Sequence, residues 1–239
     1  MLLSILSGGD IKSIIIELIL TVPVIILALS IHETAHGYVA WRCGDNTAYN
    51  LGRLTLNPLR HLDPIGTLAM LVFGFGWAKP VPINTRNFRN PKRGMALSAA
   101  AGPIANLILG LISTVFYAFF VAFYSYAVYA ELAPFLITCL NWLIVLCNFG
   151  AVINLTFAFF NLIPVPPFDG SRIALLFLPE RTYFNLMRYE REIMFGILIL
   201  LLVLSRIGFS PFSWLAYQTM DLVYTPVANG FWSLFRSLL

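Results

Sequence analysis

Residues 30–39 read SIHETAHGYV and place two histidines and a glutamate inside a strongly apolar part of the chain. On a helix, residues four positions apart lie about 40° apart around the axis and about 6 Å apart along it, so His32 and His36 point the same way. Glu33 lies directly beside them. This HExxH spacing is typical of a site where two imidazoles bind zinc and the glutamate moves a proton of the attacking water.

The composition around this stretch is that of an integral membrane protein. The chain has 239 residues, is 59% hydrophobic and only 11% charged, and has a mean hydropathy of +0.82. Soluble domains average about 25% charged residues, so this chain cannot cover a water-facing surface. We expect the lipid bilayer as a partner and no nucleic acid. Ionisable groups inside a membrane helix are costly, which marks the HETAH stretch as a functional site.

Hydropathy predicts the fold class, an all-α polytopic membrane protein formed as a single domain over residues 1–239. About four long membrane helices are expected, over residues 13–41, 95–129, 134–163 and 193–207. A helix needs about 20 apolar residues to span a bilayer. Two shorter apolar pieces, 65–78 and 173–178, are therefore predicted to be re-entrant or short elements.

The basic residues predict an orientation in the membrane. Residues 42–93 contain eight lysines and arginines and residues 172–191 contain four, out of 15 in the chain. The positive-inside rule places both segments in the cytoplasm. The HETAH stretch then lies near the cytoplasmic end of the first membrane helix. We expect a multi-pass protein of the plasma membrane with its site toward the cytoplasmic side.

A catalytic zinc keeps three protein ligands and one open position for water. Only one further histidine exists, His61, so a carboxylate is expected as the third ligand. Asp169 stands out because it follows a long apolar stretch, within NLIPVPPFDG at residues 161–170. The prolines stop a helix and hold the chain extended, and Asp-Gly forms a tight turn. His61 and the other carboxylates are open alternatives at this point.

Together these motifs resemble the site-2 protease family of intramembrane zinc metalloproteases. The second motif of that family, N-x-x-P-x-x-P-x-D-G, is filled here by Asn161, Pro164, Pro167, Asp169 and Gly170. The stretch AGPIAN at 101–106 is similar to a Gly-Pro-x-x-Asn element that the family carries at the start of its next membrane helix. HLDPIGT (61–67) and GWAKPVPIN (76–84) are similar to compact bacterial and archaeal members. The sequence departs from the family in showing no PDZ or CBS module, so regulation by such domains is not expected.

The resemblance implies that His32, His36 and Asp169 ligate one Zn²⁺ per chain. It further implies that Glu33 is the catalytic base and that Asn161 faces the substrate. The expected activity is that of an endopeptidase that cleaves a transmembrane or membrane-proximal segment of a membrane-protein substrate. Two alternatives stay open. A zinc transporter should carry metal-binding groups on several helices and often inverted repeats, and a catalytically silent protein would only bind membrane helices.

The proline pattern of WAKPVPIN, residues 77–84, predicts a small extended or β segment near the metal. Pro80 and Pro82 favour extended backbone and cannot donate to a ladder, which confines such a segment to a sheet edge. A substrate helix must unwind before its peptide bonds can be attacked. Its freed N–H and C=O groups could then pair with this edge by strand addition. The alternative is a proline-rich connector with no such role.

Overall fold

The computed structural model describes residues 10–73, 78–174, 176–179, 181–182, 185, 188–206, 208 and 211–237. Most of these residues are helical, as the composition predicts. The chain divides into two compact units. The first comprises Met1–Asn106 and Phe157–Ser210, and the second comprises Leu107–Thr156 and Pro211–Leu239. The candidate ligands all belong to the first unit.

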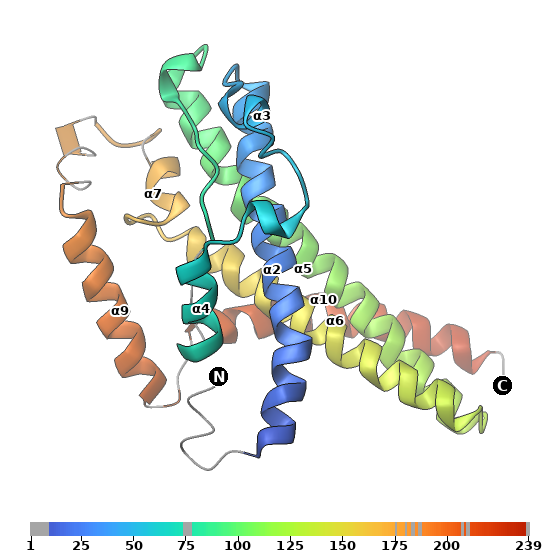
Figure 1. Ribbon diagram of the computed structural model, residues 1–239. Helices are drawn as coiled ribbons and strands as arrows, with labels where there is room; N and C mark the ends of the chain where they lie inside the picture. The colour runs from blue at the N-terminus through green and yellow to red at the C-terminus, as the bar shows by residue number, and fades with distance from the viewer. Residues whose placement is uncertain are drawn as a thin grey trace. The chain divides into compact units, whose positions relative to one another are not determined.

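Helix α2 (Ile11–Arg42) carries the HETAH stretch toward its C-terminal end (Figure 1). The helix includes Pro23 and continues past it. Arg42 lies in the last turn, where a positive charge interacts favourably with the helix dipole. The helix stops just before Gly44, whose φ of +113° lies in the left-handed region that glycine tolerates.

Three helices are long and apolar enough to cross a membrane, within the part of the chain that the structure describes. They are Leu18–Arg42 of α2, α5 (Pro91–Tyr129) and α6 (Pro134–Asn161). The predicted fourth span, 193–207, is not confirmed. Helix α9 (Glu190–Arg206) has 17 residues, about 25 Å of helix, against a hydrocarbon core of about 30 Å. Its first three residues are charged, which shortens the apolar part further.

The shorter elements lie between these helices. Helix α4 (Pro64–Phe73) occupies most of the predicted re-entrant piece 65–78, of which residues 74–77 lie outside the described part. Its 10 residues make about 15 Å of helix, too short to cross a bilayer. Four further short helices among the described residues are α3 (Thr47–Asn50), η1 (Pro58–Arg60), η2 (Thr85–Asn87) and α7 (Asp169–Ala174).

The predicted β segment at 77–84 is not confirmed. Among the described residues, strand-type pairing is limited to one isolated bridge between Leu62 and Ala78. The amide of Lys79 donates to the carbonyl of His61 at 2.8 Å, but the next residue is a proline. Because proline has no N–H, the pairing stops after this single bond.

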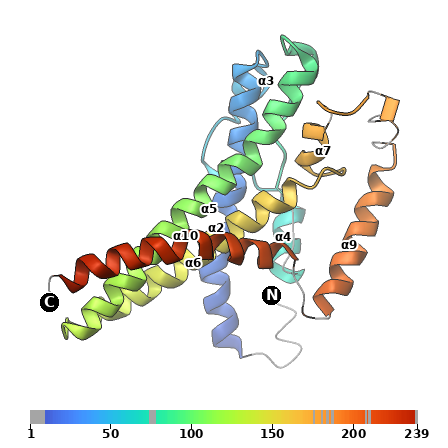
Figure 2. The same cartoon turned by 180° about the vertical axis from the view of Figure 1, so that it is seen from behind.

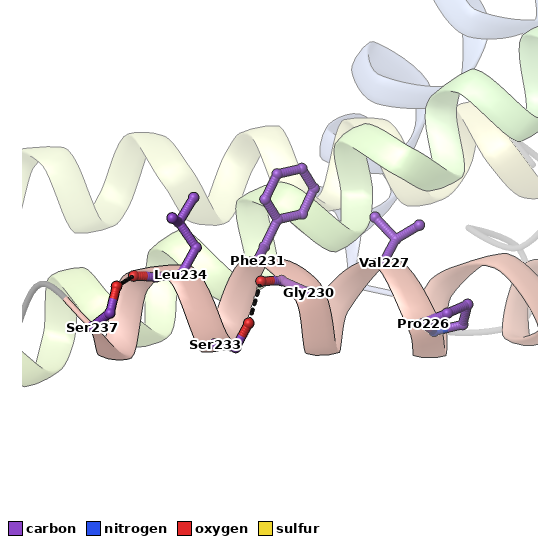
Figure 3. Close-up of a pocket in the computed structure, with 7 residues that line it drawn as sticks. All are labelled: Pro226, Val227, Gly230, Phe231, Ser233, Leu234 and Ser237. Atoms are coloured by element: carbon purple, nitrogen blue, oxygen red, sulfur yellow. Dashed lines mark hydrogen bonds between the residues drawn. The ribbon is translucent and has the colours of Figure 1, made fainter.

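The second unit is held together by aromatic side chains of α5 and α10 (Pro211–Arg236), which run alongside each other in Figures 1 and 2. Phe119 contacts Phe231 with ring centroids 5.1 Å apart, and Phe123 contacts Phe235 at 5.4 Å. The C-terminal half of α10 carries a hollow of about 630 Å³ (Figure 3). It is lined by Pro226, Val227, Gly230, Phe231, Ser233, Leu234 and Ser237.

Candidate metal centre

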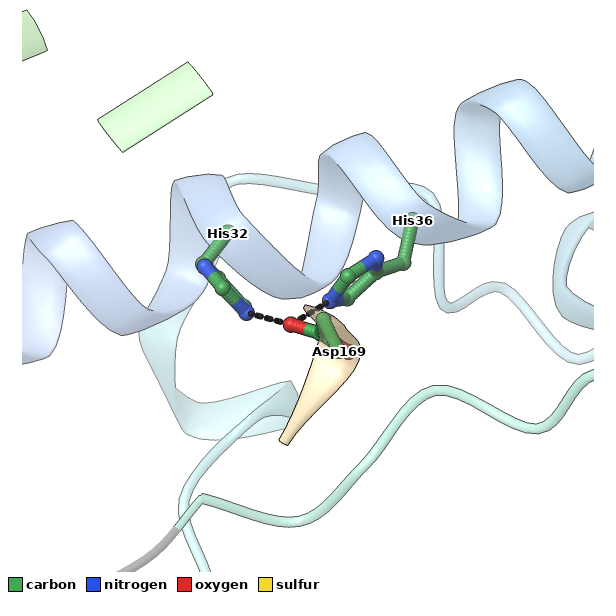
Figure 4. Close-up of side chains that lie close together, drawn as sticks. All are labelled: His32, His36 and Asp169. Carbon is green, nitrogen blue, oxygen red and sulfur yellow. Dashed lines mark hydrogen bonds and ion pairs between the residues drawn. The ribbon is translucent and has the colours of Figure 1, made fainter. Parts of the chain in front are cut away.

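The three side chains predicted to bind metal converge on one point (Figure 4). Nε2 of His32 lies 3.1 Å from Oδ2 of Asp169, and Nε2 of His36 lies 3.2 Å from the same oxygen. All three donor atoms lie within 4.8 Å of one another. No other group of three or more His, Cys, Asp or Glu side chains among the described residues is arranged to hold a metal ion.

This donor set fits zinc. Two ligands of a tetrahedral zinc ion lie about 3.3 Å apart, because each bond is about 2.0–2.1 Å long. The two imidazole-to-carboxylate distances, 3.1 and 3.2 Å, are close to that value. The rings of His32 and His36 stand edge to face with centroids 4.5 Å apart, and both histidines are buried. Nitrogen and oxygen donors of this kind are ligands that zinc prefers.

Helix periodicity and a tight turn bring the donors together. His32 and His36 lie one turn apart on α2, whereas Asp169 is the first residue of α7. The turn before α7 follows the end of α6 and contains a cis Pro166–Pro167 bond. A Cβ atom on Gly170 would collide with the main chain of Leu162 and Ile163. Only glycine therefore allows α7 to fold back this closely on the chain that follows α6.

Ser98 of α5 orients His36. Nδ1 of His36 donates to the Ser98 carbonyl at 2.7 Å, and the Ser98 hydroxyl donates to the His36 carbonyl at 2.9 Å. With its proton on Nδ1, the neutral ring keeps a lone pair on Nε2, which faces Asp169. Such outer hydrogen bonds fix the tautomer of ligating histidines. Sequence reasoning missed Ser98, although its position four residues before Gly102 places both on one helix face.

Gly102 lets α5 approach the two histidines. A Cβ atom there would lie 2.5 Å from Cε1 and Nε2 of His36 and 2.6 Å from Cε1 of His32. The sequence suggested that the glycine of AGPIAN marks the start of a helix. That prediction is wrong, because α5 already begins at Pro91. Its function in packing is instead to leave room for the imidazole rings.

The candidate ligands open onto a cavity of about 200 Å³ in the first unit. Glu33 and Asn161 also line it, so the structure brings all five predicted site residues together. The amide of Asn161 donates to the Phe157 carbonyl of its own helix at 3.0 Å. The sequence had singled out no role for Met95, Ala99 or Arg172, which also line this cavity.

His61 lies outside the donor cluster. It is almost fully buried, with Nε2 2.7 Å from the Thr55 carbonyl and 3.5 Å from the Thr34 hydroxyl. The carboxylate of Asp169 occupies the third position instead. Burial by itself raises the pKa of Asp169, but its close approach to the imidazoles of His32 and His36 outweighs the effect of burial and lowers that pKa, which favours the ionised form that binds metal.

The fold and the site together define a class of protein: a helical membrane protein with a donor set of two histidines and one aspartate. The sequence profile of Peptidase family M50 matches residues 20–205, and the chain belongs to that family. It is 44% identical over 149 residues to "Putative zinc metalloprotease YwhC" of Bacillus subtilis, a match that covers 62% of this chain and 64% of the relative.

Two more distant relatives carry the name "Putative zinc metalloprotease Rip2". The protein from Mycolicibacterium smegmatis is 32% identical over 92 residues, which is 36% of this chain and 35% of the relative. The protein from Mycobacterium tuberculosis is 30% identical over 151 residues, 61% of this chain and 52% of the relative. The chain thus matches less than two thirds of the length of each of these relatives. No solved structure matches it.

Proposed function

We propose that the chain is a zinc-dependent intramembrane endopeptidase that cleaves transmembrane or membrane-proximal peptide segments. The observation that carries the proposal is the convergence of His32, His36 and Asp169 on one point beside Glu33. The names of the relatives support zinc as the metal. We expect one Zn²⁺ per chain.

The chemistry follows from the groups around the cavity. When bound, zinc supplies a Lewis acid that lowers the pKa of water and polarises the scissile carbonyl. His32, His36 and Asp169 hold it in place. The carboxylate of Glu33 takes a proton from the attacking water and returns it to the leaving amine nitrogen as the C–N bond breaks. The water oxygen ends in the new carboxyl group.

Asn161 and the segment 79–84 are candidates for holding the substrate. A membrane helix satisfies its own N–H and C=O groups, so it must unwind locally before cleavage and needs new partners for them. Pro80, Val81 and Ile83 line the same cavity as Asn161. We propose that an unwound substrate backbone pairs with this segment on one side and with the Asn161 amide on the other.

The proposal is tested with purified protein and a model membrane helix in proteoliposomes. Glu33→Gln keeps the size of the side chain but removes the base. We expect it to retain zinc while hydrolysis falls by about 10² or more. A chelator should abolish hydrolysis by the wild-type protein, and added zinc should restore it. Unchanged turnover in Glu33→Gln would refute this mechanism.

The same preparation separates the alternatives. A zinc transporter would move zinc across the liposome membrane, and hydrolysis would be absent. A catalytically silent helix-binding protein would retain the model helix uncleaved in both the wild-type and Glu33→Gln forms. Hydrolysis that depends on zinc and on Glu33 would exclude both.

A further inference from the structure

One backbone N–H connects the segment 79–84 to Glu33. Val81 N donates to Oε2 of Glu33 at 2.7 Å, and Val81 is only 7% exposed. Pro80 and Pro82 have no N–H, so Val81 supplies the single backbone donor of this Pro-Val-Pro stretch. Proline fixes its own φ, and it restricts the residue before it to extended conformations. The local sequence therefore limits how this donor can point.

Arg53 holds the chain directly before this donor. Nη2 of Arg53 donates to the Lys79 carbonyl at 2.8 Å and to the Pro80 carbonyl at 3.3 Å. Arg53 is 8% exposed. Burying a guanidinium group is costly unless its donors find acceptors. The two carbonyls serve as acceptors here, and the contact fixes the position of the main chain that leads into Val81.

Asp45 holds the other end of the segment. Its buried carboxylate accepts hydrogen bonds from Asn84 N at 2.7 Å, Asn87 Nδ2 at 2.8 Å and Thr47 N at 3.1 Å. Burial by itself raises the pKa of Asp45, but these hydrogen bonds, together with one from the Thr47 hydroxyl, lower it. Hydrogen bonds to an ionised carboxylate are stronger than neutral ones.

Gly37 brings Val81 close to the helix that carries Glu33. It lies one turn after Glu33 on α2, so both residues face the same side. A Cβ atom on Gly37 would lie 3.0 Å from Cγ1 of Val81 and 2.6 Å from Cδ2 of Leu54. The side chain of Val81 therefore packs over Gly37 while its N–H meets Glu33.

We propose that the Val81 backbone N–H is a positioning group that orients the Glu33 carboxylate for proton transfer, with Arg53 and Asp45 holding the segment that presents it. The inference rests on the proposed protease function. The hydrogen bond engages Oε2 and leaves the second oxygen of Glu33 free for water. A flexible glutamate side chain otherwise samples several rotamers, and misplacing a catalytic group by about 1 Å can cost about 10² in rate.

The test compares two substitutions at one position. Val81→Pro removes the N–H and keeps an extended backbone. Val81→Ala removes most of the side chain but keeps the N–H, so it measures the loss due to the side chain alone. We expect kcat of Val81→Pro to lie about tenfold or more below that of Val81→Ala, with the same KM and the same zinc content. Equal kcat values in the two variants would overturn the proposal, and a difference confined to KM would assign the N–H to substrate binding instead.

Infrared spectra of protein with ¹³C-labelled glutamate test the contact without turnover. The band absent from Glu33→Gln identifies Glu33, and it should shift in Val81→Pro but not in Val81→Ala. A band that shifts in Val81→Pro, together with a wild-type protein that hydrolyses nothing, would refute the protease function and leave the contact standing. An unshifted band would refute the contact itself.

A second pair of variants covers the case in which Val81→Pro does not fold. Arg53→Met removes the donors that hold Lys79 and Pro80, whereas Arg53→Lys keeps one charged donor. We expect kcat to fall in Arg53→Met, and to recover in part in Arg53→Lys, at unchanged zinc content. A zinc-loaded Arg53→Met protein with wild-type kcat would overturn the positioning role of the segment.

Discussion

Asp169 shows at the residue scale what a single carboxylate adds to a pair of histidines. The helix period aligns His32 and His36, but two imidazoles leave a zinc site one protein ligand short. Oδ2 of Asp169 lies 3.1 and 3.2 Å from the two Nε2 atoms, which makes it the third donor available at that point. Its position depends on Gly170, since any side chain there would prevent the close turn.

Replacing Asp169 by alanine should therefore release the metal. We expect zinc affinity to fall by at least the roughly 10–100-fold that outer-shell substitutions cause, because a direct ligand is lost. Metal analysis of purified Asp169→Ala checks this. Asp221→Ala, which removes an exposed aspartate of α10, is the matched control and should keep its zinc. Full zinc occupancy in Asp169→Ala would return the role of third ligand to another carboxylate.

At the scale of elements, the site depends on how closely α5 packs against α2. The contact is made by small residues: Gly102 faces the imidazole rings, and Ser98 holds His36 through two hydrogen bonds. Both residues lie on one face of α5, one turn apart. The stretch LSAAAGP thus acts as the surface on which the histidines are oriented.

Gly102→Ala should damage this contact. The added methyl group would overlap both imidazole rings, and overpacking of this kind costs about 1–3 kcal/mol. We expect a lower Tm and weaker zinc binding. Gly196→Ala is a matched control, because Gly196 also lies within a helix and no atom lies within 4 Å of its added Cβ. A Gly102→Ala protein with the Tm and zinc content of Gly196→Ala would contradict the packing role.

At the scale of the whole molecule, the M50 match covers residues 20–205, and every candidate site residue falls within it. The basic residues that predict orientation fall mainly between α2 and α5 and after α7. Asp45, one of two acids among residues 42–93, is buried and fully engaged in hydrogen bonds. The exposed charge of this connection is therefore dominated by arginine and lysine, the pattern from which the positive-inside rule predicts a cytoplasmic segment.

Cysteine labelling tests this orientation. In a background without the native cysteines, Arg89→Cys should react only with reagent on the cytoplasmic side. Ala133→Cys, in the exposed connection between α5 and α6, should react only from the opposite side. Labelling of Arg89→Cys from outside would contradict both the predicted topology and the re-entrant assignment of residues 65–78.

Local chemistry explains which features were predictable from the sequence. Hydropathy located the three long helices, and the i, i+4 spacing aligned His32 with His36, because both depend only on nearby residues. The membrane span predicted at 193–207 and the β segment are not confirmed, although a helix, α9, covers most of 193–207. The apolar part of α9 is short because three charged residues begin this helix. The ladder stops at Pro80 because proline has no N–H, and only tertiary packing decides that Leu62 lies opposite Ala78.

The sequence by itself determined that this is a helical membrane protein of the M50 family, with HETAH on one helix face and an Asp-Gly turn after a long apolar helix. The family resemblance predicted that Asp169 joins the two imidazoles, and the tertiary structure places it there. Only the tertiary structure decided that Ser98 and Gly102 shape the site and that Val81 contacts Glu33. These contacts join residues far apart in the chain, and packing between helices selects them. Helix period and hydropathy describe only neighbours along the chain, so they carry no information about such pairs.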